Sequence, residues 1–281
     1  MIDIGQGPPL ILIPGLQGRW EWMRPAVTAL ARSFRVISFT LAGDWGSGTR
    51  FDSRLGFDNF VVQIDRIFED TGITAADLCG VSYGGLIAMR YAALRPDRVR
   101  HLVLASALPP DYEADERYQF YRRAPTLLLP LFALTAAQRG TAEIKAALPT
   151  VRERLRMVPQ AVRVLSAPVW PRHMRRRMEL IPTMDFRADV RHVRAPALAI
   201  TGEDDLDQTV PPHLTRRYLD WLPGARHVVL ERTGHMGTIT RPEAFAAVVQ
   251  EFVSRTAPGP LAASSSTWSE ASASRSARKV S

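Results

Sequence analysis

The stretch Gly80-Val81-Ser82-Tyr83-Gly84-Gly85 is the most specific local pattern in the sequence. It follows an apolar run that ends at Cys79 and precedes a helix-like segment, residues 84–94, which Pro96 closes. A sharp turn from strand to helix strains its central residue and requires small residues on either side. The pattern therefore predicts that Ser82 projects its hydroxyl above the end of a strand. The alternative interpretation is a glycine-rich turn with an incidental serine.

Strand-like and helix-like segments alternate on both sides of this turn. Short apolar runs rich in β-branched residues occupy residues 10–13, 36–39, 99–105, 197–201 and 228–230. Apolar residues at helical spacing mark residues 20–31, 58–69, 84–94, 212–222 and 242–255. Strands that alternate with helices form a mostly parallel sheet with helices on both faces. The sequence therefore predicts an α/β fold.

Two regions break the alternation. Residues 111–189 are rich in arginine and proline and contain no convincing strand, which predicts a helical insertion that divides the α/β core into residues 1–110 and 190–255. Residues 256–281 consist mainly of Ala, Ser and Pro with scattered charge. Such a composition cannot bury enough apolar surface to offset the entropy of ordering, so we expect a disordered tail there.

A serine hydroxyl is a weak nucleophile near neutral pH and needs a base, usually a histidine, within hydrogen-bond reach. Of the six histidines, His235 is the best candidate because Gly234-His235-Met236-Gly237 follows the last predicted strand and precedes the last predicted helix. A loop in that place leaves the carboxyl end of the sheet, where the active sites of open α/β sheets gather. A surface-loop histidine is the alternative.

A carboxylate should orient that histidine and stabilise its protonated form. Gly202-Glu203-Asp204-Asp205-Leu206-Asp207 follows the strand 197–201 and precedes His235, which gives the chain order Ser, Asp, His. The stretch holds four acids in six residues, so its residues alone do not single one out. Asp111, which comes soon after the strand 99–105, is a second possible position for the acid.

Four motifs together resemble the α/β-hydrolase superfamily, especially its small-molecule esterases and carbon–carbon bond hydrolases. They lie at residues 9–18, at 80–85, at 202–205 with Val210-Pro211, and at 234–236 before Arg241-Pro242-Glu243. The resemblance covers about residues 5–255, except the insertion. It implies the α/β-hydrolase fold with a helical cap inserted after the sixth strand. It also implies Asp205 as the triad acid, because the family's acid usually stands three residues after the glycine.

The resemblance also implies an oxyanion hole made by the backbone N–H groups of Leu16 and Tyr83. The family normally has His-Gly where this chain has Pro14-Gly15. The hole is built from main chain, so the missing histidine leaves both donors in place. A second departure is that Met1–Gly7 supplies only a remnant of the antiparallel strands that usually precede the first central strand.

The insertion would cover the site and line its pocket. Four residues are candidates for this lining: Trp170, Met174, Met178 and Met236, with Met184 as a further possibility. Packing within the cap itself is the alternative for the cap residues. The arginines of the insertion, among them Arg176 and Arg177, either bind a carboxylate or phosphate or form a solvated helix face.

Composition and net charge further limit the possible functional classes. The chain has 281 residues and a net charge of +8, but it shows no nucleic-acid-binding module and no apolar run of about 20 residues that would cross a membrane. The lone Cys79 and the absence of a leader-like start favour a cytoplasmic protein. We expect a monomer or homodimer that acts on a small molecule without a metal or organic cofactor.

The predicted function is therefore hydrolysis of an ester-like bond by Ser82, His235 and Asp205 through an acyl-enzyme. Carbon–carbon bond hydrolysis, perhydrolysis or a lyase step by the same triad is one alternative. A non-catalytic ligand-binding protein on this fold is another. An epoxide hydrolase or dehalogenase would need a carboxylate in place of Ser82.

Overall fold

The computed structural model describes residues 1–113, 120, 127–167 and 170–259. The first residues of the predicted disordered tail are ordered against the core, since the Gly259 N–H donates to the Arg100 carbonyl at 2.8 Å. Residues 260–281 of this tail lie outside the described residues. Within the described part of the chain, no helix is both long and apolar enough to cross a membrane.

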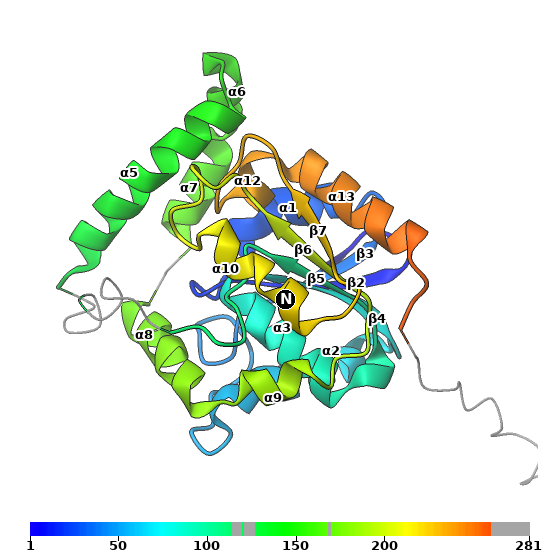
Figure 1. Cartoon of the computed structure of the whole chain (residues 1–281). Helices are drawn as coiled ribbons and strands as arrows, with labels where there is room; N and C mark the ends of the chain where they lie inside the picture. The colour runs from blue at the N-terminus through cyan, green and yellow to red at the C-terminus, as the bar shows by residue number, and fades with distance from the viewer. Residues whose placement is uncertain (114–119, 121–126, 168–169, 260–281) are drawn as a thin grey trace, which may run out of the picture.

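A seven-stranded sheet runs through the centre of the molecule, with the strand order β1-β3-β2-β4-β5-β6-β7 (Figure 1). Only β1 is antiparallel to its neighbour, so the sheet is mostly parallel, as predicted. The strands are β1 (Ile2–Ile4), β2 (Pro9–Ile13), β3 (Arg35–Ser38), β4 (Ala76–Val81), β5 (Val99–Ala105), β6 (Ala197–Thr201) and β7 (Arg226–Val229). The short β1 lies within Met1–Gly7, the segment in which the sequence predicted antiparallel strand structure.

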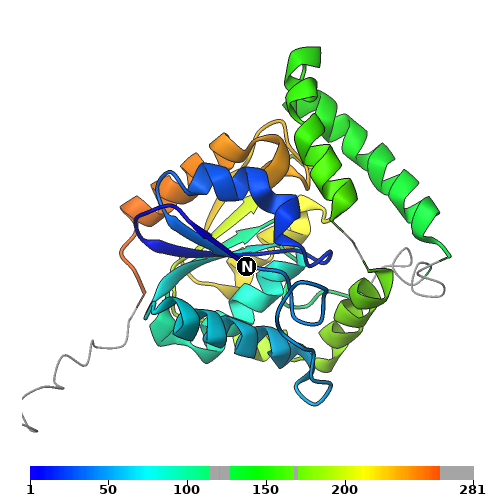
Figure 2. The ribbon, with the colours of Figure 1, turned by 180° about the vertical axis from the view of Figure 1, so that it is seen from behind.

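Helices cover both faces of this sheet (Figures 1 and 2). One face carries α1 (Arg24–Leu30), α12 (Gly237–Thr240) and α13 (Pro242–Arg255); the other carries α2 (Asn59–Thr71), α3 (Tyr83–Leu94), α9 (Phe186–Val190), α10 (Pro212–Arg216) and α11 (Tyr218–Trp221). Successive strand residues point to opposite faces. Leu10 and Leu12 accordingly pack in the core with α1 and α13, and Ile11 and Ile13 pack in the core with α2 and α3. Both faces are therefore apolar, which is why the strands read as continuous hydrophobic runs.

A helical segment connects β5 to β6. It contains α5 (Leu129–Ala147), α6 (Val151–Arg156), α7 (Val158–Ser166), α8 (Pro171–Leu180) and the 3-10 turn Ile181–Thr183 before α9. None of the described residues of this segment forms a strand. The segment follows the fifth strand of this chain rather than the sixth, because only one strand precedes β2.

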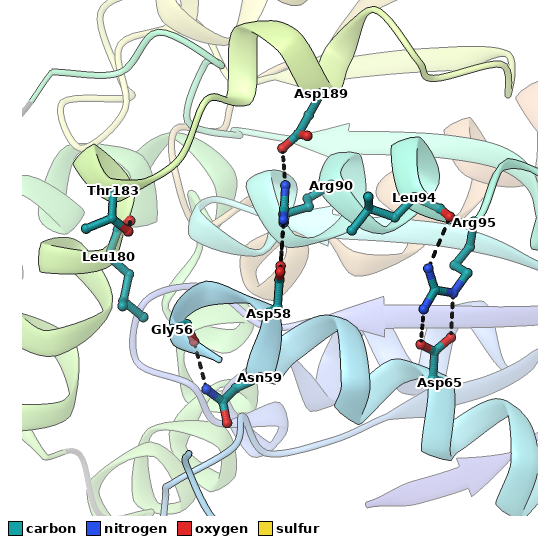
Figure 3. A network of polar contacts seen from close by, with 10 residues as sticks. All are labelled: Gly56, Asp58, Asn59, Asp65, Arg90, Leu94, Arg95, Leu180, Thr183 and Asp189. Carbon is teal, nitrogen blue, oxygen red and sulfur yellow. Dashed lines mark hydrogen bonds and ion pairs between the residues drawn. The ribbon is translucent and has the colours of Figure 1, made fainter. Parts of the chain in front are cut away.

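The segment contacts the rest of the fold on both sides of the sheet. The Gln160 side chain of α7 donates hydrogen bonds to the carbonyls of Glu21 and Trp22, beside α1, at 3.2 and 2.9 Å. On the opposite side, the Arg177 carbonyl of α8 accepts the Tyr83 hydroxyl of α3 at 3.1 Å. The segment then leads into α9, whose Asp189 pairs with Arg90 of α3, and Arg90 also binds Asp58 at the start of α2 (Figure 3). The segment is therefore tied to both helical layers.

Candidate active site

Ser82 occupies the turn between β4 and α3 in a strained backbone conformation, with φ 55° and ψ −120°. Glycine neighbours allow this turn, because a Cβ on Gly84 would lie 2.5 Å from the carbonyl oxygen of Ile13. Two hydrogen bonds hold the turn: the Ser82 N–H donates to Ala105 O at 2.9 Å, and Ser82 O accepts the Gly85 N–H at 2.9 Å. Such strain in a non-glycine residue persists only where the surroundings enforce it, and it concentrates at functional sites.

The two residues predicted to supply the oxyanion hole lie on either side of Ser82. Tyr83 is the first residue of α3, where backbone amides have no partner within the helix and the helix dipole favours negative charge. Gly15 lies close to the serine, since a Cβ built on it would be 3.3 Å from the Cβ of Ser82. Leu16 follows Gly15 directly in the loop after β2. The loop is thus in a suitable place to present a backbone N–H near the serine.

His235 lies in the loop between β7 and α12, and this loop packs closely on the loop after β6. The Glu203 N–H donates to the Thr233 carbonyl at 2.8 Å. A Cβ on Gly202 would lie 2.6 Å from the carbonyl oxygen of Gly234, so the two loops meet where glycines remove side chains. A small cleft lined by Val81, Ser106 and His235 joins the end of β4 to this loop. The histidine and the serine turn therefore lie at the same edge of the sheet.

The acid that faces His235 is Asp207. Its Oδ2 lies 3.3 Å from the Nδ1 of His235, and the aspartate side chain is 1% exposed against 20% for the histidine. The other carboxylate oxygen accepts the N–H groups of Thr209 and Val210 at 3.0 and 2.9 Å. Burial alone would raise the pKa of Asp207, but the His235 charge and these hydrogen bonds outweigh it and lower the pKa. Asp207 therefore stays ionised beside the ring.

The structure differs here from the prediction of Asp205 as the acid. The carbonyl of Glu203 accepts the N–H groups of Leu206 and Asp207, both at 3.1 Å, and this turn directs Asp207 inward. Asp205 is left exposed, and Asp204 forms an ion pair with Arg216 at the surface. Counting residues from the glycine does not detect a helical turn in the loop. The Thr-Val pair two and three residues after Asp207 was the available signal, because aspartate commonly accepts backbone N–H groups at these positions.

Asp111, the second position considered for the acid, forms ion pairs with Arg187 and Arg217. The carboxylate is thereby engaged away from the loop that carries His235.

Comparison with known proteins agrees with this architecture. A sequence model of the family described as alpha/beta hydrolase fold matches residues 8–242. The chain belongs to the alpha/beta hydrolase family. The predicted fold class and family resemblance are confirmed.

Several curated relatives of this alpha/beta hydrolase carry hydrolase names. It is 25% identical over 246 residues to "Putative carbamate hydrolase RutD" of Pseudomonas savastanoi pv. phaseolicola, a match covering 88% of this chain and 93% of the relative. It is 24% identical over 261 residues to 2-hydroxy-6-oxo-2,4-heptadienoate hydrolase of Pseudomonas putida, covering 89% and 91%. The crystal structure of the enol-lactonase from Burkholderia xenovorans LB400 superposes with a TM-score of 0.72 at 23% identity, covering 90% and 95%. These names support a hydrolase, and the superposition supports the fold.

The predicted pocket residues of this alpha/beta hydrolase lie in different environments. Met178 is buried in the core layer that contains α2 and α3, so it packs against the α/β core rather than within the cap alone. Trp170 is 49% exposed at the start of α8. Met174 is half-buried, and so is Met236, beside His235. Met184 packs against the core from the turn before α9.

Arg177 of α8 contacts both residues of the candidate oxyanion hole. Its Nη1 donates to the Leu16 carbonyl at 2.8 Å, and its own carbonyl accepts the Tyr83 hydroxyl at 3.1 Å. The guanidinium also pairs with Asp44 at 2.5 Å, and both of these side chains are buried. The neighbouring Arg176 stacks over the Phe51 ring, with its guanidinium carbon 3.8 Å from the ring centroid. The sequence offered Arg177 as an anion-binding residue, whereas the structure pairs it with a carboxylate of the protein.

Glu143 of α5 is a functional candidate that sequence reasoning missed. Its carboxylate accepts the N–H of Met236, the residue after His235, at 2.9 and 3.0 Å. It also accepts the Thr240 hydroxyl at 3.2 Å. The contact joins residues 93 positions apart, and no local motif signals it. Among the described residues, no cluster of histidine, cysteine, aspartate or glutamate is arranged to hold a metal ion.

Proposed function

We propose that this alpha/beta hydrolase is a serine hydrolase that cleaves an ester-like bond of a small molecule through an acyl-enzyme. Ser82 is the nucleophile, His235 is the general base, and Asp207 orients the histidine in the place predicted for Asp205. The observation that carries the proposal is the strained Ser82 turn at the same sheet edge as the His235–Asp207 pair. A strained serine, a histidine and an ionised acid from three separate loops are the groups that acyl transfer requires.

The reaction proceeds in two steps. His235 takes the proton of the Ser82 hydroxyl while Oγ attacks the substrate carbonyl, and the carbonyl π electrons move to its oxygen. The backbone N–H groups of Leu16 and Tyr83 bind this oxyanion, and each such donor typically contributes about 3 kcal/mol in the transition state. The intermediate collapses and expels the alcohol, which receives the proton from His235. Water then attacks the acyl-serine by the same route, releasing the acid and restoring Ser82.

Helices α5–α8 act as a cap in this proposal. Their attachment to the site supports this role, because Arg177 binds the loop that carries Leu16 and Glu143 binds the loop that carries His235. The cap would exclude water from the acyl-enzyme and shape the substrate pocket. We propose Met174 and Met236, both half-buried, as part of the pocket wall.

A second candidate function is hydrolysis of a carbon–carbon bond by the same three residues. The relative named 2-hydroxy-6-oxo-2,4-heptadienoate hydrolase favours it, since that name denotes an enzyme acting on a ketone rather than an ester. One fold supports many reactions, so only the substrate distinguishes these candidates.

The test is a panel of p-nitrophenyl esters of varied acyl length, together with a vinylogous diketone, assayed on wild type and on Ser82→Ala. Ser254→Ala is the control, because Ser254 is an exposed serine on α13 whose hydroxyl donates only to the Glu251 carbonyl of the same helix. We expect Ser82→Ala to lose turnover and labelling by a fluorophosphonate probe, and Ser254→Ala to retain both. Turnover that survives in Ser82→Ala refutes the nucleophile. Wild type that neither turns over nor labels supports a non-catalytic binding protein.

A further inference from the structure

The buried Glu143 carboxylate is placed where charge is costly. The residue is 2% exposed, on a helix that belongs to the connection between β5 and β6. The pKa of Glu143 is raised, because desolvation and the charge of Asp207 outweigh the opposing effects of the Met236 and Gly234 N–H groups and the His235 charge. Removing the side chain would leave the Met236 N–H and the Thr240 hydroxyl without this acceptor, which costs stability. A neutral glutamine could accept from the same donors, so stability alone gives no reason for a charge at this position.

The helix surface around Glu143 fits the His235 loop closely. Gly140, one turn earlier on α5, faces Met236, because a Cβ at position 140 would lie 2.8 Å from the methionine Cε. Both Glu143 oxygens receive the Met236 N–H, and one of them also receives the Thr240 hydroxyl of α12. The carboxylate therefore binds the backbone immediately after His235 and the helix that follows it.

We propose that Glu143 is a positioning residue for His235, which fixes the histidine loop and supplies a second negative charge to the imidazolium formed during catalysis. The inference rests on the proposed function for the role of His235. Two carboxylates then face this histidine: Asp207, from the loop after β6, contacts Nδ1, and Glu143, from α5, acts through the neighbouring backbone and through space.

The direction in which the Glu143 charge affects His235 follows because the interaction between two titrating groups is reciprocal. The positive charge of His235 lowers the pKa of Glu143. By linkage, the negative charge of Glu143 must raise the proton affinity of His235 by the same free energy. Removing that charge therefore makes His235 lose its proton at a lower pH and makes the imidazolium-bearing transition state less stable.

The deciding variant is Glu143→Gln, which keeps the shape and one acceptor but removes the charge. We expect kcat to fall about tenfold with KM nearly unchanged, and the acid limb of the kcat/KM profile to move down by about one pH unit, as for loss of a charge near a titrating group. Thr240→Val is the matched control, since it removes a hydrogen bond to Glu143 but keeps the charge. It should leave the acid limb in place, and Glu143→Asp should restore the wild-type limb in part.

An NMR titration of the His235 imidazole separates this inference from the proposed function, because it needs no turnover. A lower imidazole pKa in Glu143→Gln than in wild type supports the inference even if the wild type hydrolyses none of the substrates. An unchanged imidazole pKa overturns it, even if kcat falls. If Glu143→Gln does not fold, Glu143→Asn makes the same comparison, because this shorter amide also removes the charge and keeps an acceptor for the Met236 N–H.

Discussion

Asp207→Asn is the substitution that tests the acid of the triad most directly. The asparagine amide oxygen can take over the hydrogen bonds that one carboxylate oxygen accepts from Thr209 and Val210. Its NH₂ group then faces Nδ1 of His235, at the 3.3 Å position now occupied by Oδ2. Because an amide NH₂ can only donate, Nδ1 becomes the acceptor and the ring carries its proton on Nε2. That tautomer cannot take the Ser82 proton.

The expected loss is large and confined to catalysis. A wrong tautomer at this position lowers kcat on the order of 10⁴-fold, which corresponds to about 5.5 kcal/mol in the transition state. Asparagine has the same shape as aspartate and keeps the two backbone hydrogen bonds, so the fold should persist. Asp205→Asn is the matched control on the same loop. Asp205 is exposed, and a surface substitution of this kind changes free energies by about 0.5 kcal/mol or less.

The assay compares wild type, Asp207→Asn and Asp205→Asn by steady-state ester hydrolysis and by the rate of fluorophosphonate labelling at Ser82. Far-UV circular dichroism confirms the fold of each variant. The reasoning is refuted if Asp205→Asn loses activity while Asp207→Asn keeps it. It is also refuted if the probe labels Ser82 at the wild-type rate in both variants, because the histidine would then need no carboxylate partner.

Two further predictions concern stability. Arg90→Met should lower the free energy of unfolding by about 1–2 kcal/mol in a urea titration, because it leaves Asp189 and the more exposed Asp58 without their cation, and a loss under about 0.5 kcal/mol would contradict this. Folding lowers the pKa of Asp207, so its ionised form stabilises the folded state. This contribution is complete above the unfolded-state pKa of about 3.9 and is lost as the pH falls through the lower pKa of the folded state. The stability difference between wild type and Asp207→Asn should therefore shrink on acidification below about pH 4, and a constant difference would contradict this.

The sequence predicts the central sheet well because each parallel strand is buried on both faces. The predicted runs 99–105 and 197–201 coincide with β5 and β6, and the others differ from the observed strands by one or two residues. The serine turn is equally readable, since only small residues fit where α3 approaches β2. Constraints of this kind involve residues that are close together in the chain, so they can be recognised from a single sequence.

Asp205 and Asp207 illustrate what a local pattern does not determine. Four acids follow Gly202 within five positions, and all four are compatible with a loop at the end of β6. The turn centred on the Glu203 carbonyl decides which one points inward, and the packing of that loop against Gly234 fixes the turn. The selection therefore depends on a contact between two loops about 30 residues apart in the chain, and spacing within one loop cannot express it.

The helical segment between β5 and β6 shows the same limit over longer distances. Its arginines and prolines predict helices and turns, but the partners of Arg177 and Glu143 lie 161 and 93 residues away. Arg177 binds the carbonyl of Leu16 in the loop after β2, and Glu143 binds the amide of Met236 in the loop after β7. Each charge reaches one of the two backbone loops that the proposed reaction requires to be fixed, on either side of Ser82. Because both anchors belong to one segment, the proposed mechanism predicts that a substrate which displaces this segment alters the oxyanion donors and the base together.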